Sequence, residues 1–184
     1  PFNFPAMIPW GWMVPLAIAT GNTVVLKAAS PTPLTAMRIL ELFYEEAGFP
    51  KGVVNLVTCS RKESEILLTD PRIKAVTFVG STEVGKHIYS VAAAHGKRVQ
   101  AQCEAKNHAL VLDDCDLEST VNAIVNSTYG CAGMRCMALP AICVQETIAD
   151  EFVKLLKEKA EKMVVGCAYH IGTKLGPLVT AEHK

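Results

Sequence analysis

The sequence has no excess of charge of either sign. Its 184 residues carry 18 lysines and arginines against 18 aspartates and glutamates, and the isoelectric point is near 7.3. Nucleic acids and anionic membranes attract proteins through clusters of positive charge. The balance therefore predicts neither a nucleic acid nor a membrane as a partner, and a small molecule is the partner that we expect.

The cysteines lack the pattern of a disulfide framework or of a zinc site. There are seven, at positions 59, 103, 115, 131, 136, 143 and 167, and no two of them form a C-x-x-C pair. Disulfide-stabilised domains and zinc sites depend on paired cysteines. We therefore expect free thiols, no metal, and a reducing compartment, either the cytoplasm or the mitochondrial matrix.

Long uninterrupted apolar runs are also missing. The opening residues 1–19 are apolar, but prolines at positions 1, 5, 9 and 15 interrupt them. Because proline breaks the hydrogen bonding of a helix interior, we predict a buried, irregular segment rather than a membrane span. The chain starts inside this segment and without a methionine, so we expect it to be a piece of a longer protein.

Short apolar strands and helical patterns alternate along the first half of the chain. Strands are predicted at residues 23–27, 53–57 and 75–79, and helices are predicted to begin at Pro33, Ser64 and Thr82. Thr32 is the expected N-cap of the first helix, which Gly48 ends. This alternation is typical of the α/β class, with a doubly wound, Rossmann-like parallel sheet.

The second half continues the alternation. Strands are predicted at residues 108–112 and 141–144, and helices at residues 116–126, with Asp116 as the N-cap, and at residues 147–163. The pattern changes near residues 95–98. We therefore divide the chain into residues 1–98 and residues 99–184.

Residues 80–85, Gly-Ser-Thr-Glu-Val-Gly, follow a predicted strand and open a predicted helix. The first N–H groups of a helix and the helix dipole bind anions such as phosphate. The segment lacks the G-x-G-x-x-G spacing, so an ordinary turn is the alternative to a dinucleotide site. Lys27 ends an earlier strand, at the edge where open α/β sheets bind ligands, although a lone lysine is often simply solvated.

The strongest chemical candidate is Cys136, which follows Arg135 in a stretch rich in small residues. A thiolate can attack a carbonyl carbon, and a neighbouring guanidinium favours the thiolate form. A cysteine that only fills space in a core is the alternative. Asn3 is a polar residue among apolar residues and prolines, and its amide either bonds to a turn or donates to a developing oxyanion.

Four separated stretches resemble, in order and spacing, the signatures of the NAD(P)-dependent aldehyde dehydrogenase superfamily. They are residues 1–5, 21–27, 78–85 and 133–136. The resemblance covers the whole chain, but only the central portion of a family member. Within the superfamily, residues 96–101, 105–108 and 135–139 are similar to the CoA-acylating methylmalonate-semialdehyde dehydrogenases.

The resemblance implies roles for individual residues. Cys136 would be the nucleophile, and Asn3 with the Cys136 N–H would form the oxyanion hole. Arg135 would bind the carboxylate of a semialdehyde acid, because a guanidinium binds a carboxylate through two hydrogen bonds. The residues that would hold the cofactor, NAD or else NADP, are Lys27, Ser30, Gly80, Ser81 and Gly85.

The resemblance also implies a division of labour. Residues 1–98 would be part of the NAD-binding domain, and residues 99–184 part of an α/β catalytic domain that carries the nucleophile. The intact protein would be a homo-oligomer. Its reaction would oxidise methylmalonate or malonate semialdehyde through a cysteinyl thioester, lose CO₂ and transfer the acyl group to CoA, giving propanoyl-CoA or acetyl-CoA.

One position separates the possible fates of the thioester. Gln102 stands where hydrolytic members of the family have the glutamate that activates water, and an amide cannot take up that proton. Glu104 is a possible substitute base, expected on the same face of the strand but displaced by about 7 Å.

Other departures from the family pattern keep alternatives open. Ser30 replaces a glutamate that binds the adenosine ribose, Gln102 replaces the asparagine and Glu104 the glycine usual in the CoA-acylating group, and Met134 replaces a glutamine. The alternatives are a hydrolytic aldehyde dehydrogenase that releases the free acid, and a truncated, non-catalytic nucleotide-binding module.

Overall fold

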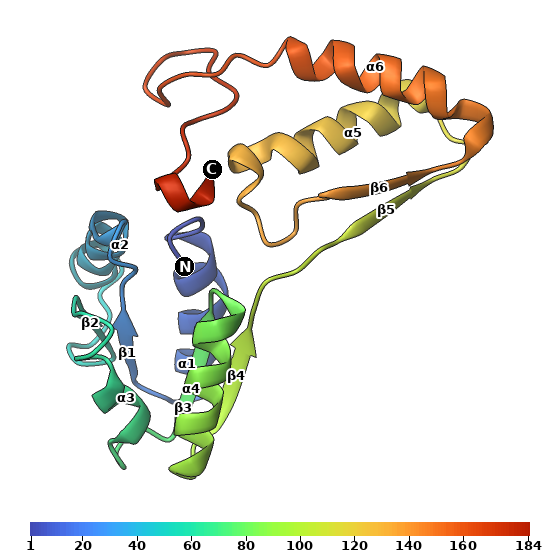
Figure 1. Cartoon of the computed structure of the whole chain (residues 1–184). Coiled ribbons are helices and arrows are strands. Elements are labelled where there is room, and N and C mark those ends of the chain that lie inside the picture. The colour runs from blue at the N-terminus through green and yellow to red at the C-terminus, as the bar shows by residue number, and fades with distance from the viewer. The chain divides into compact units, whose positions relative to one another are not determined.

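The computed structural model describes all 184 residues, and the chain forms two compact units, residues 1–104 and residues 105–184 (Figure 1). We call them the N-terminal unit and the C-terminal unit. The division falls later than the one expected after residue 98. The reason is that β4 (Arg98–Gln102) pairs along its whole length with β3 (Ala75–Val79), which lies in the N-terminal unit.

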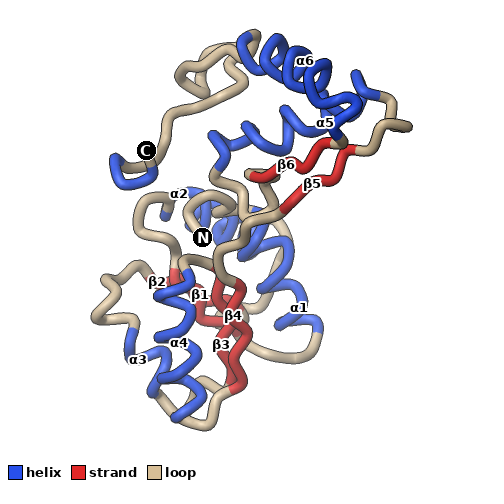
Figure 2. Tube along the Cα trace, turned by 45° about the vertical axis from the view of Figure 1, so that its right-hand side comes forward, coloured by secondary structure: helices blue, strands red, loops and turns tan.

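The N-terminal unit alternates helices with parallel strands (Figure 2). Its further elements are η1 (Met7–Met13), α1 (Val14–Ala19), β1 (Val24–Lys27), α2 (Pro33–Glu45), β2 (Val54–Val57), α3 (Glu65–Thr69) and α4 (Thr82–Ala94). β1 pairs with β2 in register Val24 to Val54, and β3 pairs with β4, both in parallel. Helical crossovers of this kind are what parallel neighbours require.

Residues 7–19 of the opening segment are helical, so the prediction of an irregular segment is wrong for them and holds only for residues 1–6. η1 is a π-helix that runs directly into α1. Pro9 and Pro15 lie in the first turns of these two helices, where a missing N–H removes no intrahelical hydrogen bond. The segment was also predicted to be buried, and this is correct only in part. Trp10 is 7% exposed, but Leu16 is 71% exposed.

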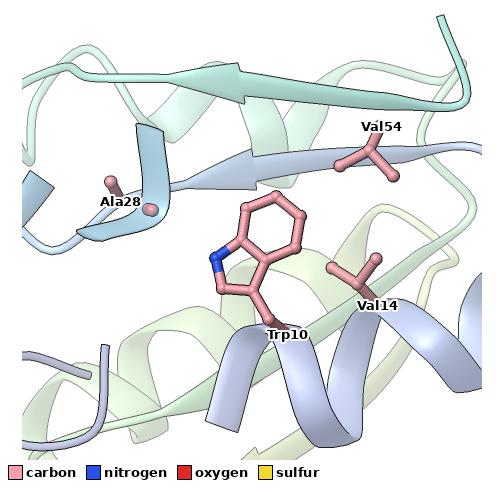
Figure 3. Close-up of a cluster of buried hydrophobic side chains, with 5 residues drawn as sticks. Trp10, Val14, Ala28 and Val54 are labelled. Carbon is pink, nitrogen blue, oxygen red and sulfur yellow. The ribbon is translucent and has the colours of Figure 1, made fainter. Parts of the chain in front are cut away.

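A hydrophobic cluster joins the opening helices to β1, β2 and α2. Figure 3 shows the indole ring of Trp10 pointing from η1 toward Val14, Ala28 and Val54. The ring of Phe43 from α2 lies 5.2 Å from that of Trp10, centroid to centroid. Burial of one large apolar side chain stabilises a fold by about 1.5–3 kcal/mol, so this cluster holds the β1–β2 pair against its helices.

The C-terminal unit contains one further parallel pair and two long helices. Its elements are β5 (His108–Val111), α5 (Leu117–Tyr129), η2 (Gly130–Gly133), β6 (Ala141–Val144), η3 (Glu146–Ile148), α6 (Ala149–Glu161) and η4 (Ala181–His183). β5 pairs with β6 in register His108 to Ala141. Val111, Val121, Ile124, Val125 and Phe152 form the core between the strands, α5 and α6.

Two predicted helix N-caps have different outcomes. Asp116 caps α5 as predicted, because its Oδ1 accepts a hydrogen bond of 2.7 Å from the Ser119 N–H. Thr32 occupies the N-cap position of α2, but its hydroxyl makes no capping bond and is buried without a partner. A hydroxyl buried in this way costs stability.

The α/β class and the parallel pairing of strands are confirmed. Within this chain, hydrogen bonds join the strands as three two-stranded sheets, β1–β2, β3–β4 and β5–β6. The predicted helix at residues 147–163 is shorter in the structure, since the 3-10 helix η3 precedes α6 and the α-helix ends at Glu161. No helix is both long and apolar enough to span a bilayer.

Candidate active site

Cys136 lies in a tight turn of the C-terminal unit. The Ala138 N–H donates to the Arg135 carbonyl at 3.1 Å, so Cys136 and Met137 are the two central residues of a four-residue turn. The side chain of Cys136 is half-buried. A turn of this kind lifts its central side chains away from the neighbouring backbone, which suits a thiol that must meet a substrate.

Side chains from two other elements hold this turn. Asn107, the residue before β5, donates through Nδ2 to the carbonyls of Cys136 at 2.8 Å and of Ala138 at 3.0 Å. Thr128, near the end of α5, donates to the Leu139 carbonyl at 3.0 Å. The sequence analysis missed both residues. The sequence held one signal for Asn107, namely its position directly before a predicted strand.

The loop before the turn is strained. Cys131 and Ala132 have φ angles of 53° and 54°, in the left-handed region, and Gly133 follows at 71°. Glycine adopts this region readily, but residues with a Cβ do so at a cost, and such strain concentrates at functional sites. Strain directly beside the predicted nucleophile supports a functional role for the loop.

The Arg135 side chain turns back over this loop. Its Nε donates to the Cys131 sulfur at 3.5 Å, and its guanidinium lies so close to Gly130 that a Cβ there would come within 2.6 Å of it. The sequence analysis assigned Arg135 to a substrate carboxylate and did not single out Cys131. In the structure the guanidinium faces the Cys131 thiol. To bind a carboxylate, Arg135 would have to give up its contact with Cys131.

An apolar cavity of about 520 Å³ borders the same loop within the C-terminal unit. It is lined by the end of α5, by Ala132 and Gly133, and by Val165 and residues 175–178 of the C-terminal segment. Its walls are almost entirely hydrocarbon. The cavity can receive apolar groups close to the strained loop.

The predicted phosphate site lies between β3 and α4 in the N-terminal unit. Gly80 follows β3, and Ser81 occupies the N-cap position of α4 without a side-chain capping bond. Side chains of the protein itself fill the space beside Gly80 and Gly85, where a Cβ would stand. A Cβ on Gly85 would lie 2.3 Å from the Cys103 sulfur, and one on Gly80 would lie 2.5 Å from the Phe78 ring.

A carboxylate of the chain itself lies at the first turn of α4. The carboxylate of Glu104 accepts a hydrogen bond of 3.2 Å from the Thr82 N–H. Hydrogen bonding to the Thr82 side chain and, second, to this N–H lowers the pKa of the Glu104 carboxyl. The N–H groups there are thus disposed to hold an anion, which fits the phosphates of a dinucleotide if Glu104 withdraws. The expectation that Glu104 continues the strand of Gln102 is wrong, because β4 ends at Gln102.

The remaining predicted residues lie in the N-terminal unit. Lys27, half-buried at the end of β1, donates to the Ala28 carbonyl at 3.3 Å. Asn3 is half-buried and Ser30 is exposed. Asn3 and Cys136 belong to different units, and their joint action as an oxyanion hole stays a prediction.

Comparison with known proteins gives the class to which this architecture belongs. The chain matches the aldehyde dehydrogenase family over residues 1–184, and it belongs to that family. Over all 184 residues it is 50% identical to malonate-semialdehyde dehydrogenase 1 of Oceanobacillus iheyensis, and it spans 37% of that relative's length.

Solved structures agree with this assignment. All of the chain superimposes on 37% of a methylmalonate-semialdehyde dehydrogenase from Oceanimonas doudoroffii, with a TM-score of 0.94 and 42% identity. It also matches betaine aldehyde dehydrogenase of Staphylococcus aureus in complex with NAD⁺, with a TM-score of 0.90 and 34% identity, over 98% of this chain and 36% of that one. The resemblance read from the sequence is therefore confirmed at the level of the family.

Proposed function

We propose that this chain is the central part of an NAD-dependent, CoA-acylating dehydrogenase of malonate or methylmalonate semialdehyde. The 50% identity to a malonate-semialdehyde dehydrogenase supports the substrate class. The observation that carries the chemistry is the turn around Cys136, which presents one thiol beside a strained loop and is tied on two sides by hydrogen bonds.

The thiolate of Cys136 adds to the aldehyde carbon, and the carbonyl oxygen takes the electron pair as an oxyanion. By the family resemblance, the Asn3 amide and the Cys136 N–H would donate to that oxygen and lower the barrier to its formation. NAD, when bound, supplies the hydride acceptor. After oxidation the acyl group is held on Cys136 as a thioester, which loses CO₂ and takes up a proton at the same carbon. The CoA thiolate then attacks the thioester carbonyl, and Cys136 leaves as the thiolate.

Five residues of the N-terminal unit would hold NAD, or NADP in its place: Lys27, Ser30, Gly80, Ser81 and Gly85. Ser81 lies at the N-cap position of α4 without a capping bond of its own, so its hydroxyl is available to a phosphate. The first N–H groups of α4 would donate to the same phosphate. Glu104 must leave the Thr82 N–H for this to happen.

Gln102 favours CoA over water as the acyl acceptor. It is exposed, and its amide cannot accept the proton that a glutamate takes up at this position in the hydrolytic members of the family. Removal of a positioned base typically lowers a rate by about 10²–10⁴. Hydrolysis of the thioester should be slow, while a CoA thiolate can attack without that base.

Arg135 would select a substrate that carries a carboxylate. A guanidinium forms two parallel hydrogen bonds with a carboxylate, and these are stronger than its long contact with the Cys131 sulfur. The substrate acid would therefore displace Cys131 from Arg135. The intact protein would act as a homo-oligomer.

Single-turnover NADH formation by the intact protein from methylmalonate semialdehyde tests this proposal, with and without CoA, beside a Cys136→Ala control. A burst that requires Cys136, with further turnover only when CoA is present, is the expected result. Steady turnover without CoA would instead establish a hydrolytic dehydrogenase. The absence of any burst would favour a non-catalytic nucleotide-binding module.

A further inference from the structure

We infer that Asn107 is a positioning residue for the nucleophile, which it holds by fixing the backbone on both sides of Met137. The inference rests on the proposed function, in which Cys136 attacks the substrate. It concerns a residue that touches neither substrate nor cofactor. Its effect would pass through the backbone of the turn.

The hydrogen bonds of Asn107 leave its amide only one orientation. Nδ2 lies 2.8 Å from the Cys136 carbonyl oxygen and 3.0 Å from the Ala138 carbonyl oxygen. Both partners are acceptors, so the group that faces them must be the NH₂, and its two N–H bonds are both used. No other neutral side chain of the same size offers two donors at one atom.

The turn needs these donors. Its internal hydrogen bond, from the Ala138 N–H to the Arg135 carbonyl, leaves the carbonyls of Cys136 and Ala138 without a backbone partner. Ala138 is 5% exposed, so water has little access on that side. A buried carbonyl without a donor costs about 1–3 kcal/mol, and the turn would rearrange to avoid this cost.

Asn107 is itself held in place by the parallel strand pair. It directly precedes β5, and His108 lies opposite Ala141 at the start of β6. The chain therefore brings Asn107 beside the segment that leads from Cys136 into β6. On the other side, Thr128 of α5 holds the Leu139 carbonyl at 3.0 Å. Asn107 adjoins β5 and Thr128 lies in α5, and both of these elements pack into the core that contains Val111 and Phe152.

The direction of the Cys136 thiol follows from this arrangement. With its carbonyl fixed by Asn107 and the flanking turn closed, Cys136 retains little freedom in its backbone angles. Its N–H and its sulfur then leave the backbone in constant directions. Catalytic groups tolerate errors of only about 0.5 Å, and a misplacement of 1 Å can cost about 10²-fold in rate.

Three variants of Asn107 remove its hydrogen-bond donors to different extents. Asn107→Ser keeps one donor, Asn107→Ala keeps none, and Asn107→Asp is nearly isosteric but places a negative charge against two carbonyls. Reactivity of Cys136 should therefore fall in that order. The carboxylate should have the largest effect because it also opposes a thiolate nearby.

The measurement is the iodoacetamide reaction of each thiol, located by peptide mass spectrometry. The exposed Cys143 serves as the internal reference. We expect the ratio of Cys136 to Cys143 rates to fall about threefold in Asn107→Ser and about tenfold or more in Asn107→Asp. In the intact enzyme, kcat should fall with little change in KM.

Asn55 provides a matched control, because its Nδ2 also donates to two backbone carbonyls, of Gly52 at 2.9 Å and Val24 at 3.3 Å. Asn55→Asp should leave the ratio unchanged. An unaltered ratio in Asn107→Ser and Asn107→Ala, with circular dichroism like that of the parent, would overturn the role of Asn107. If Cys136 is no more reactive than Cys143 in the parent protein, the proposed nucleophile itself fails.

Discussion

The carboxylate of Glu104 and the backbone N–H of Thr82 form a hydrogen bond of 3.2 Å across the first turn of α4. The positive end of the helix dipole and the free N–H groups favour a negative charge at this position. The same N–H groups are those that would bind a cofactor phosphate. Glu104 therefore stabilises the protein when no cofactor is bound, and it competes with the phosphate of the proposed cofactor.

Glu104→Gln should tighten NAD binding. The glutamine removes a negative charge from the position that the pyrophosphate would take, and we expect the dissociation constant to fall about two- to fivefold at low ionic strength. Isothermal titration calorimetry measures this. Glu83→Gln is the matched control, since Glu83 lies in the same helical turn but makes no bond to Thr82. Equal changes in both variants would mean that only net charge matters.

The bond between Glu104 and Thr82 should also give a defined pH dependence. Hydrogen bonding to the Thr82 side chain and, second, to the Thr82 N–H lowers the pKa of the Glu104 carboxyl, so the stability that this interaction contributes is complete above the ordinary carboxyl pKa. This stability is lost as the pH falls through the lowered pKa. The melting temperature of the parent should exceed that of Glu104→Gln at pH 7, and the difference should shrink below about pH 4. A constant difference would show that the bond does not form.

Thr32→Val should not destabilise the protein and should stabilise it by up to about 1 kcal/mol. The hydroxyl of Thr32 is buried and unpaired, and valine has the same shape without a group that needs a partner. Asp116→Ala is the contrasting variant, and it should cost about 1 kcal/mol because Asp116 caps α5. Urea denaturation measures both. A loss in Thr32→Val equal to that in Asp116→Ala would mean that Thr32 caps α2 after all.

Lys97→Met should destabilise the N-terminal unit by about 2 kcal/mol or more. Lys97 is 7% exposed, and its ammonium donates to the carbonyls of Asp70 and Ile73. Methionine keeps most of the side-chain volume but leaves both carbonyls without this donor. Lys86→Met, at an exposed position of α4, is the control and should change stability by less than about 0.5 kcal/mol. Similar denaturation midpoints for the two variants would contradict the prediction.

Several elements could be predicted because their signals are local. The strands at residues 75–79 and 141–144 have the bounds that the sequence predicts, and α4 begins at Thr82 as predicted. Each is a periodic apolar pattern bounded by glycine, proline or a capping residue. The cap at Asp116 also depends only on residues up to three positions away.

The errors share a different cause. The prolines of the opening segment were taken as helix breakers, but their effect depends on where each helix begins. Thr32 has the right residue type for a cap, yet burial and the path of the chain leave its hydroxyl unpaired. Glu104 was assigned to a strand, but that strand ends two residues earlier, at Gln102, and the carboxylate reaches a helix 22 positions back in the sequence.

The sequence by itself determined the α/β class, because that depends on apolar patterns at short, regular spacings. It also determined the family, through four stretches that resemble the family's signatures, and that resemblance implies Cys136 as the nucleophile. Only the tertiary structure decided which groups surround that nucleophile. Asn107 reaches the Cys136 carbonyl across 29 positions of the chain, and Arg135 turns toward Cys131 rather than into open solvent. The Asn107 contact depends on how the β5–β6 pair and α5 pack together, and no local pattern encodes that packing.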